Sequence, residues 1–276
     1  MEQSHNSAGR FLVMDTSTAM LCTAVMEGAA VLAENNLLAQ RGHAELLMPA
    51  VRDVLQASGT KQHELSGIIA GVGPGSYTGI RIAVAAGKSL AWSLGIPVVG
   101  ISSLEMLGLG AWAQGAGLAA GDLLAAAEGR EAAPATGAAS AAEWVVPLMD
   151  ARRGQVYTAL FETAPGIMPR RLEPDGIRQM ADWTASLAAL WSALPPEVRP
   201  SAVTLAGDAD KHAATAELLR PLLGDALRIT EYAPQGAWGG LLGAARLLRG
   251  EHGDPHQLQP NYTQLTEAEV NKLQGL

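Results

Sequence analysis

Short apolar runs bounded by glycine or proline alternate with helical patterns along most of the chain. The clearest case begins with Ile68 to Val72, a β-branched run that predicts a buried strand. A glycine-rich loop follows at residues 73–79, and small and apolar residues then recur at helical spacing until Gly95 and Pro97 end the helix. Residues 97–101 predict a further strand. This order of strand, loop, helix and strand indicates a βαβ unit.

The stretch before this unit predicts three antiparallel strands and one helix. Residues 11–15, 21–26 and 30–38 are apolar runs separated by short turns, which is typical of a strand meander. Residues 43–57 predict an amphipathic helix, in which Pro49 indicates a kink or a later start. The apolar stripe of this helix consists of Leu46, Leu47, Ala50, Val51, Val54 and Leu55.

The second half repeats the alternation of strands and helices without a comparable glycine loop. A capping-box pattern at residues 102–105 predicts a helix to about Trp112, and the Ala/Gly-rich residues 114–143 predict an extended insertion without an assigned function. Further strands are expected at residues 144–149, 155–161, 202–206 and 227–230, and helices at 182–194, 211–223 and 238–249. We therefore expect two α/β domains, residues 1–103 and a smaller, degenerate one at 104–276.

Composition and charge narrow the classes of function. The 276 residues are 48% hydrophobic and 17% charged, and the formal net charge is −8, which argues against a large surface for a phosphate backbone. The single cysteine, Cys22, has no internal partner, and residues 1–10 lack the apolar core of a signal peptide. No run is long enough to span a membrane. We expect a cytoplasmic protein without a membrane partner.

The glycine loop has two interpretations. Backbone N–H groups at a helix N-terminus can hold phosphate, but residues 73–79 fit neither the dinucleotide-binding nor the P-loop spacing. The alternative is a tight turn that lets a small-residue helix pack closely on the sheet. The spacing favours this alternative.

Four stretches, in this order along the chain, resemble the TsaB family. They are Met14 to Thr18, Gly42 to Pro49, Gly73 to Arg81 with Ala86 to Ala91 behind it, and Asp150 to Tyr157. The tail also resembles this family's closing motif, but only as far as Tyr262, because Thr263 and Gln264 replace its Leu and Arg.

The resemblance implies the actin-like fold of sugar kinases and heat-shock chaperone ATPases, with two related α/β domains. In those enzymes an aspartate on the first hairpin meets the phosphate and metal of ATP, and Asp15 occupies the corresponding position here. The loop-capping interpretation, in which the carboxylate accepts hydrogen bonds from Ser17 and Thr18 amides, is favoured instead. The residues of a vestigial nucleotide site would be Asp15, Thr16, Ser17, Thr18, Gly73, Gly75, Ser76 and Thr78.

The resemblance also implies a function. The family is the non-catalytic member of the bacterial system that makes threonylcarbamoyladenosine beside the anticodon in tRNA. Its partners would be a metal-containing TsaD-like transferase and a TsaE-like P-loop ATPase, with tRNA reached through the complex and a homodimer formed when the chain is alone. ATP or ADP would bind, if at all, at the partner interface, and no cofactor is assigned to this chain. The interface would comprise His43, Leu46, Leu47, Ala50, Val51, Val54, Ile80, Ala83, Gly87, Leu90 and Leu94.

Other activities receive less support. Of the six histidines, one pair has helical spacing, His252 and His256, and a Gly-Asp-Pro break separates its members, so we expect no metal site. Ser76 lacks a G-x-S-x-G context, so no catalytic residue is assigned. The rival hypothesis is an ATP-dependent kinase or transferase with phosphate held by residues 15–18 and 73–78, and a metalloprotease is a third. Arg152 and Arg153 would contact RNA or a partner carboxylate. An exposed turn that contacts only solvent explains them equally well.

Overall fold

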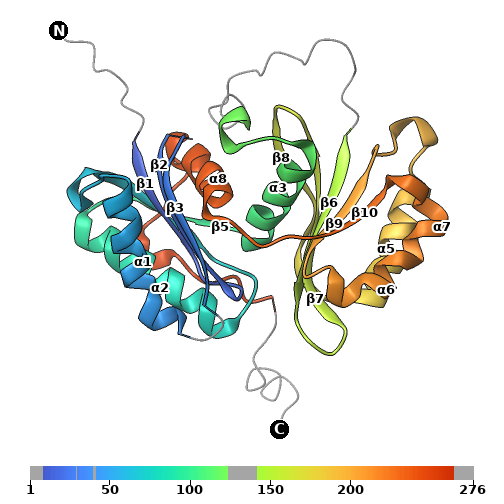
Figure 1. The fold of residues 1–276 in the computed structure, drawn as a ribbon, viewed down its shortest axis with the longest axis horizontal. Coiled ribbons are helices and arrows are strands. Elements are labelled where there is room, and N and C mark those ends of the chain that lie inside the picture. Colours follow the sequence, from blue (N-terminus) through green and yellow to red (C-terminus); the bar gives the residue numbers. More distant parts are fainter. Residues whose placement is uncertain (1–8, 29, 40–41, 124–141, 264–276) are drawn as a thin grey trace.

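The computed structural model describes residues 9–28, 30–39, 42–123 and 142–263, which form two lobes, each built on a five-stranded sheet (Figure 1). The first sheet has the order β3-β2-β1-β4-β5. Its strands are β1 (Arg10–Asp15), β2 (Met20–Glu27), β3 (Ala30–Leu38), β4 (Leu65–Gly71) and β5 (Val98–Ile101). The second sheet has the order β10-β9-β6-β7-β8. Its strands are β6 (Glu143–Asp150), β7 (Gln155–Ala164), β8 (Ile167–Gln179), β9 (Val203–Gly207) and β10 (Leu227–Glu231).

The two sheets have the same topology. β1 pairs antiparallel with β2 and parallel with β4, and β6 pairs antiparallel with β7 and parallel with β9. Each lobe therefore begins with a three-stranded meander and adds two parallel strands beside its first strand. This repeat agrees with the two related α/β units that the sequence predicts.

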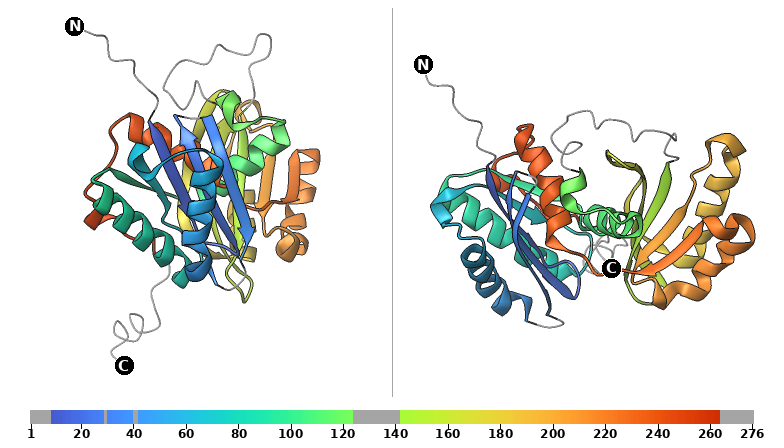
Figure 2. Two further views of the ribbon diagram at one scale, coloured as in Figure 1. Left: turned by 60° about the vertical axis from the view of Figure 1, so that its left-hand side comes forward. Right: turned by 45° about the horizontal axis from the view of Figure 1, so that its top comes forward.

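Helices cover both faces of each sheet (Figure 2). On the outer side of the first sheet lie α1 (His43–Ala57) and α2 (Tyr77–Leu94). On the outer side of the second lie α5 (Met180–Ala193), α6 (Ala213–Ala216) and α7 (Arg220–Leu223). Two further helices, α3 (Ser103–Ala116) and α8 (Gly236–Leu248), lie between the sheets.

The two central helices are exchanged between the lobes. The α3 helix follows β5 of the first sheet but packs on β6, β7 and β9 of the second, whereas α8 follows β10 but packs on β1, β2, β4 and β5. The helices also pack against each other. Residues 104–276 therefore do not form one unit around the second sheet, because α8 returns to the first lobe.

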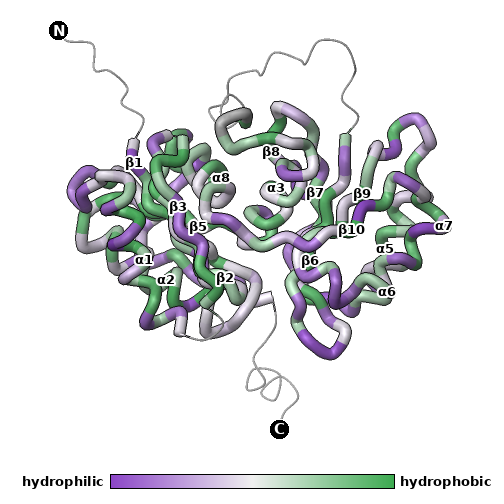
Figure 3. Tube along the Cα trace, viewed as in Figure 1, coloured by the Kyte–Doolittle hydropathy of each residue, from purple (hydrophilic) through white to green (hydrophobic). Residues whose placement is uncertain are grey.

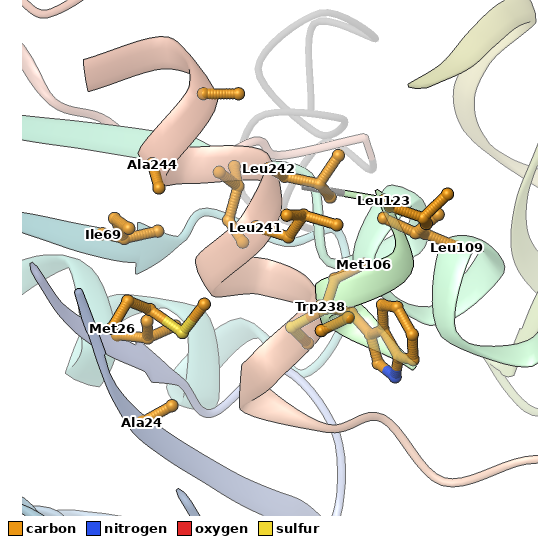
Figure 4. Close-up of a cluster of buried hydrophobic side chains, with 14 of the residues drawn as sticks. Ala24, Met26, Ile69, Met106, Leu109, Leu123, Trp238, Leu241, Leu242 and Ala244 are labelled. Carbon is orange, nitrogen blue, oxygen red and sulfur yellow. The ribbon is translucent and has the colours of Figure 1, made fainter. Parts of the chain in front are cut away.

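The interior of the first lobe lies on both faces of its sheet. Along β1, Phe11 and Val13 face the α3 and α8 side, while Leu12 and Met14 face α1 and α2. A strand that is buried on both faces appears in sequence as a continuous apolar run. Figure 4 shows the cluster between the lobes, where Trp238 and Leu241 of α8 meet Met106 of α3.

Three predicted elements differ from the structure. The helix expected to end near Trp112 continues to Ala116, and a 3₁₀ turn at Ala120–Leu123 places Ala120 and Leu123 in the core. These residues belong to the stretch predicted as an extended insertion, and the rest of it, 124–141, lies outside the described residues. The helix predicted at 211–223 is a series of short α and 3₁₀ turns, within which Pro221 lies.

The sequence analysis did not predict β8. This strand contains Pro169 and Pro174, which argue against a central strand, and it lies at the edge of its sheet, where proline is tolerated. Of the two predicted effects of Pro49, the later start is wrong, since α1 begins at His43 and runs through it. Among the helices that the structure describes, none has the length and apolar character to cross a bilayer.

Glycines in α8 allow this helix to approach the first sheet closely. A Cβ at Gly240 would lie 2.5 Å from Sδ of Met26, and a Cβ at Gly243 would overlap the side chain of Ile69. Both neighbours are fully buried, so neither has free space into which it could move. The close packing of α8 on the first sheet therefore depends on these small residues.

We predict that Gly243→Ala lowers the free energy of unfolding by about 1–3 kcal/mol, because the added methyl group overpacks a β-branched neighbour. The matched control is Gly115→Ala in α3, where nothing lies within 4 Å of the added Cβ. This control should raise stability by up to about 1 kcal/mol through helix propensity alone. Urea unfolding measures both, and equal effects would contradict the packing argument.

Candidate functional site

The carboxylate of Asp15 is fully buried at the end of β1 and is engaged by neighbouring groups of the chain. Its Oδ1 accepts hydrogen bonds from the Ser17 amide at 2.7 Å and the Ser17 hydroxyl at 2.6 Å. Its Oδ2 accepts a short hydrogen bond from the hydroxyl of Ser103, the first residue of α3. The loop-capping interpretation predicts contacts with the Ser17 and Thr18 amides, and the structure shows the one with Ser17.

The glycine loop packs directly against the tip of the β1–β2 hairpin. The Ser76 amide donates to the Ser17 carbonyl at 2.7 Å, and Thr16 Oγ1 donates to the Gly79 carbonyl at 2.7 Å. A Cβ at Gly75 would overlap the Ser17 carbonyl, and one at Gly79 would overlap the Thr16 carbonyl. Gly75 and Gly79 therefore allow the loop backbone to approach the hairpin backbone closely, a contact that the sequence analysis did not predict.

Ser103 joins three parts of this arrangement. Besides its bond to Asp15, its Oγ accepts from the Gly73 amide at 3.1 Å, and its own amide donates to the Gly73 carbonyl at 2.9 Å. The sequence analysis used Ser103 only as part of a capping box. The cap itself is Ser102, whose hydroxyl accepts from the Glu105 amide at 3.2 Å, which leaves Ser103 free to connect α3 with the loop.

Most of the predicted vestigial nucleotide residues are consequently inside the protein. Asp15, Thr16, Ser17, Gly73 and Gly75 are buried, Thr18 is half-buried, and Ser76 and Thr78 are exposed. Ser76 Oγ accepts from the Gly79 amide at 3.3 Å and so caps α2. The structure brings these residues together, but as a packed junction of hairpin, loop and helix.

A cleft of about 950 Å³ opens between the lobes beside this junction. Its first-lobe wall includes Ser17, Thr18, His43 and Ser76, and its second-lobe wall includes Asp150, Arg152, Tyr157, Asp208, Lys211 and Tyr232. Burial raises the pKa of the Tyr157 and Tyr232 hydroxyls, so both stay neutral at physiological pH.

Asp150, Asp208 and Lys211 of the second-lobe wall form hydrogen bonds within that wall. Asp150 ends β6 at the position that Asp15 occupies on β1, and its Oδ1 lies 3.1 Å from Nε2 of the buried His212. The Asp150 amide donates to Asp208 at 2.9 Å, and Lys211 Nζ donates to the same carboxylate at 2.8 Å. The bond to Asp208 raises the pKa of Lys211. Arg152 and Arg153, both exposed and with positive φ angles of 67° and 52°, form the hydrophilic tip of the β6–β7 hairpin (Figure 3).

The described residues contain no group of three or more His, Cys, Asp or Glu side chains that could hold a metal ion. The His252 and His256 pair lies on the exposed segment after α8, where His256 packs its ring against Trp92. The Ser17 hydroxyl donates to the buried Asp15 carboxylate, and Ser76 Oγ caps α2.

The structure also locates the predicted interface residues, and most of them face inward. The side chains of Leu47, Ala50, Val51, Val54, Ile80 and Ala83 are at most 2% exposed, and Gly87 is buried. These residues cover the first sheet, so their side chains do not form a contact surface for another chain. Leu46 is exposed, and His43, Leu90 and Leu94 are half-buried. Met48, Tyr77 and Trp92 are exposed on the same helices and were not predicted.

We predict that Asp15→Ala lowers the free energy of unfolding by at least about 2 kcal/mol, because it leaves buried donors without an acceptor. Asp15→Asn keeps one carbonyl oxygen and should cost less. Asp210→Ala, at an exposed position of the same cleft, is the matched control and should change stability by less than about 0.5 kcal/mol. Urea unfolding measures the free energy of unfolding of the three variants. If Asp15→Ala is as stable as the control, the carboxylate is not a structural group.

The chain is similar in sequence to one protein family model and to several known proteins. The family model for TsaD, tRNA N6-adenosine threonylcarbamoyltransferase, matches residues 36–133. The tRNA threonylcarbamoyladenosine biosynthesis protein TsaB of Bacillus subtilis is 32% identical over 264 residues, which cover 96% of this chain and 98% of the relative. The Escherichia coli protein of the same name is 25% identical over 71% of this chain and 78% of its own.

Solved structures support the fold. YeaZ from Pseudomonas aeruginosa superposes with a TM-score of 0.66 and 21% identity, over 92% of this chain and 99% of that one. A second Pseudomonas aeruginosa structure, described as similar to peptidase YEAZ, gives a TM-score of 0.68 over 93% and 100%. The fold is that of these YeaZ structures, two α/β lobes with the same sheet topology. The Bacillus subtilis TsaB protein is 32% identical to this chain along almost the whole length of both, so the protein belongs to the TsaB family.

Proposed function

We propose that this chain is an accessory subunit in the biosynthesis of threonylcarbamoyladenosine in tRNA, where it binds and activates a TsaD-type transferase. The names of its Bacillus subtilis and Escherichia coli relatives support the pathway. The match of a transferase family model to residues 36–133 supports a partner of related architecture. In this proposal the transferase carries the chemistry, and this chain stabilises its active conformation.

The observation that carries the accessory role is the engagement of Asp15. In the rival hypothesis, an ATP-dependent kinase or transferase, Asp15 would meet the phosphate and metal of ATP. Here its two oxygens bind Ser17 and Ser103, and the glycine loop beside it is packed against the hairpin backbone. A nucleotide phosphate could reach Asp15 only if this junction came apart.

The surface that we propose for the partner is the outer side of α1 and α2. It exposes Leu46, Met48, Tyr77 and Trp92, the last with 69% of its surface accessible. Large apolar side chains grouped on neighbouring helices are typical of protein interfaces. In the absence of the transferase the same surface would support a homodimer. A TsaE-type ATPase and tRNA would join through the complex, which fits the net charge of −8.

The direct test is co-purification with the TsaD-type transferase of the same organism. Leu46→Asp combined with Trp92→Asp should weaken the complex by at least about tenfold, because each change places a charge in an apolar contact. Leu218→Asp on the second lobe, at a position that is 69% exposed, is the matched control and should leave binding unchanged. Buried positions such as Leu47 and Ala83 are unsuitable, since changing them would test folding.

Activity separates the two hypotheses. In reconstituted tRNA threonylcarbamoylation, Asp15→Asn should retain activity at a temperature where it is folded, whereas the double variant of α1 and α2 should lose it. Loss of activity in folded Asp15→Asn, with an intact complex, would favour the enzyme hypothesis instead.

A further inference from the structure

The tip of the β6–β7 hairpin holds two neighbouring arginines in an unfavourable backbone conformation. Arg152 and Arg153 have φ angles of 67° and 52°, and among the residues that the structure describes they are the only ones other than glycine with positive φ. A residue with a Cβ is strained in this region, whereas glycine occupies it without that cost. Arginine at both positions therefore indicates a use for the two side chains that offsets the strain.

Hydrogen bonds hold the turn in this conformation. The Gln155 amide donates to the Arg152 carbonyl at 2.9 Å, and the Arg152 amide donates to Asp150 Oδ1 at 3.2 Å. The Gly154 carbonyl accepts from the amide of Met180, the first residue of α5, at 2.8 Å. The turn is thus a fixed base from which the two arginine side chains extend.

Neither arginine side chain has a partner within the described part of the chain. Both are exposed, and no hydrogen bond or ion pair forms there with either guanidinium group, although the chain has 27 acidic and only 19 basic residues. Each of the other arginines that the structure describes forms at least one such contact. The amides of Arg153 and Gly154 also donate to no described group. A turn with unpaired donors and positive charge favours an anion.

The hairpin tip lies beside the surface that we propose for the transferase. Arg152 lines the cleft between the lobes, and the same cleft is lined by His43, the first residue of α1, and by Ser76, which caps α2. A substrate held by a protein that binds α1 and α2 would therefore come within reach of the tip.

We propose that Arg152 and Arg153 contact the phosphodiester backbone of tRNA when this chain is in complex with the transferase. The inference rests on the proposed function, because the tRNA is the substrate of that transferase. It adds a direct contact between the second lobe and the RNA, which the proposed function brings in only through the complex.

An RNA backbone fits this tip better than a protein carboxylate does. The planar guanidinium of arginine binds phosphate oxygens through two parallel hydrogen bonds and keeps its charge at any physiological pH. Two adjacent guanidinium groups match the phosphates that repeat along one strand, whereas a single carboxylate would occupy only one of them. A contact of this small size is also compatible with the net charge of −8, which argues against a broad surface for nucleic acid.

The test measures the dissociation constant of the assembled complex with the TsaD-type transferase for unmodified tRNA over a series of salt concentrations. Arg152→Ala with Arg153→Ala should raise the constant by about tenfold or more, and should lower the slope of its logarithm against the logarithm of salt concentration by about 2, because two phosphate contacts are lost. Arg170→Ala with Arg228→Ala, two exposed arginines elsewhere on the second lobe, is the matched control and should change neither quantity.

A glycine variant separates binding by these side chains from a structural role. Arg152→Gly with Arg153→Gly removes the same charges but suits the positive φ angles, so it should melt no lower than the wild type while it binds tRNA as weakly as the alanine variant. A melting temperature clearly below that of the wild type would show that the arginines stabilise the turn, and would overturn the inference.

The outcomes also separate this inference from the proposed function. If the wild-type chain forms no complex with the transferase, the proposed function fails and the inference fails with it. If the complex forms but the alanine variant binds tRNA with the wild-type constant and salt slope, the inference alone is overturned. It is likewise overturned if titration calorimetry shows that the alanine variant weakens binding of the transferase while the assembled complex keeps its affinity for tRNA, because the arginines would then meet a protein carboxylate.

Discussion

The first lobe depends on the contact between two stretches of backbone that are about sixty residues apart in sequence. The tip of the β1–β2 hairpin and the glycine loop before α2 approach so closely that a side chain at Gly75 or Gly79 would overlap a carbonyl of the hairpin. The Asp15 carboxylate stabilises the junction from the hairpin side, and Ser103 links it to α3. Because α3 crosses to the second sheet, one buried carboxylate connects the sheet, the loop and the helix between the lobes.

The second lobe repeats the topology, and Asp150 ends β6 as Asp15 ends β1. Around the cleft between them, several polar groups are bonded within each wall: Asp15 with two serines, Asp150 with His212, and Asp208 with Lys211. His43 Nε2 and the Tyr232 hydroxyl, which also line the cleft, are buried without a hydrogen-bond partner among the described residues. Large apolar side chains are exposed on α1 and α2, among them Leu46, Met48, Tyr77 and Trp92.

The sequence predicts much of this arrangement, and the misses have physical reasons. The meander, the βαβ unit and the β6–β7 hairpin follow from local periodicity and turn residues. The glycine loop was predicted as a tight turn before a helix that packs on the sheet, but the hairpin it contacts is a long-range partner that local pattern does not identify. The apolar stripes of α1 and α2 were predicted correctly as stripes, but they cover the sheet, so the side chains available to a partner are those between the stripes, such as Trp92.

β8 was missed because its prolines and charges are compatible only with an edge position. The path of α8 was missed because a helix pattern does not say which sheet the helix covers.

The central claim, that this chain acts through its helical surface and keeps its aspartate and glycine loop for folding, can be tested by hydrogen–deuterium exchange. The account predicts that adding the TsaD-type transferase slows exchange in α1 and in α2, and that Mg·ATP alone leaves exchange at residues 15–18 and 73–79 unchanged. Slower exchange at those loops with Mg·ATP, and no change in α2 with the transferase, would show that the cleft is the working site and would contradict the account.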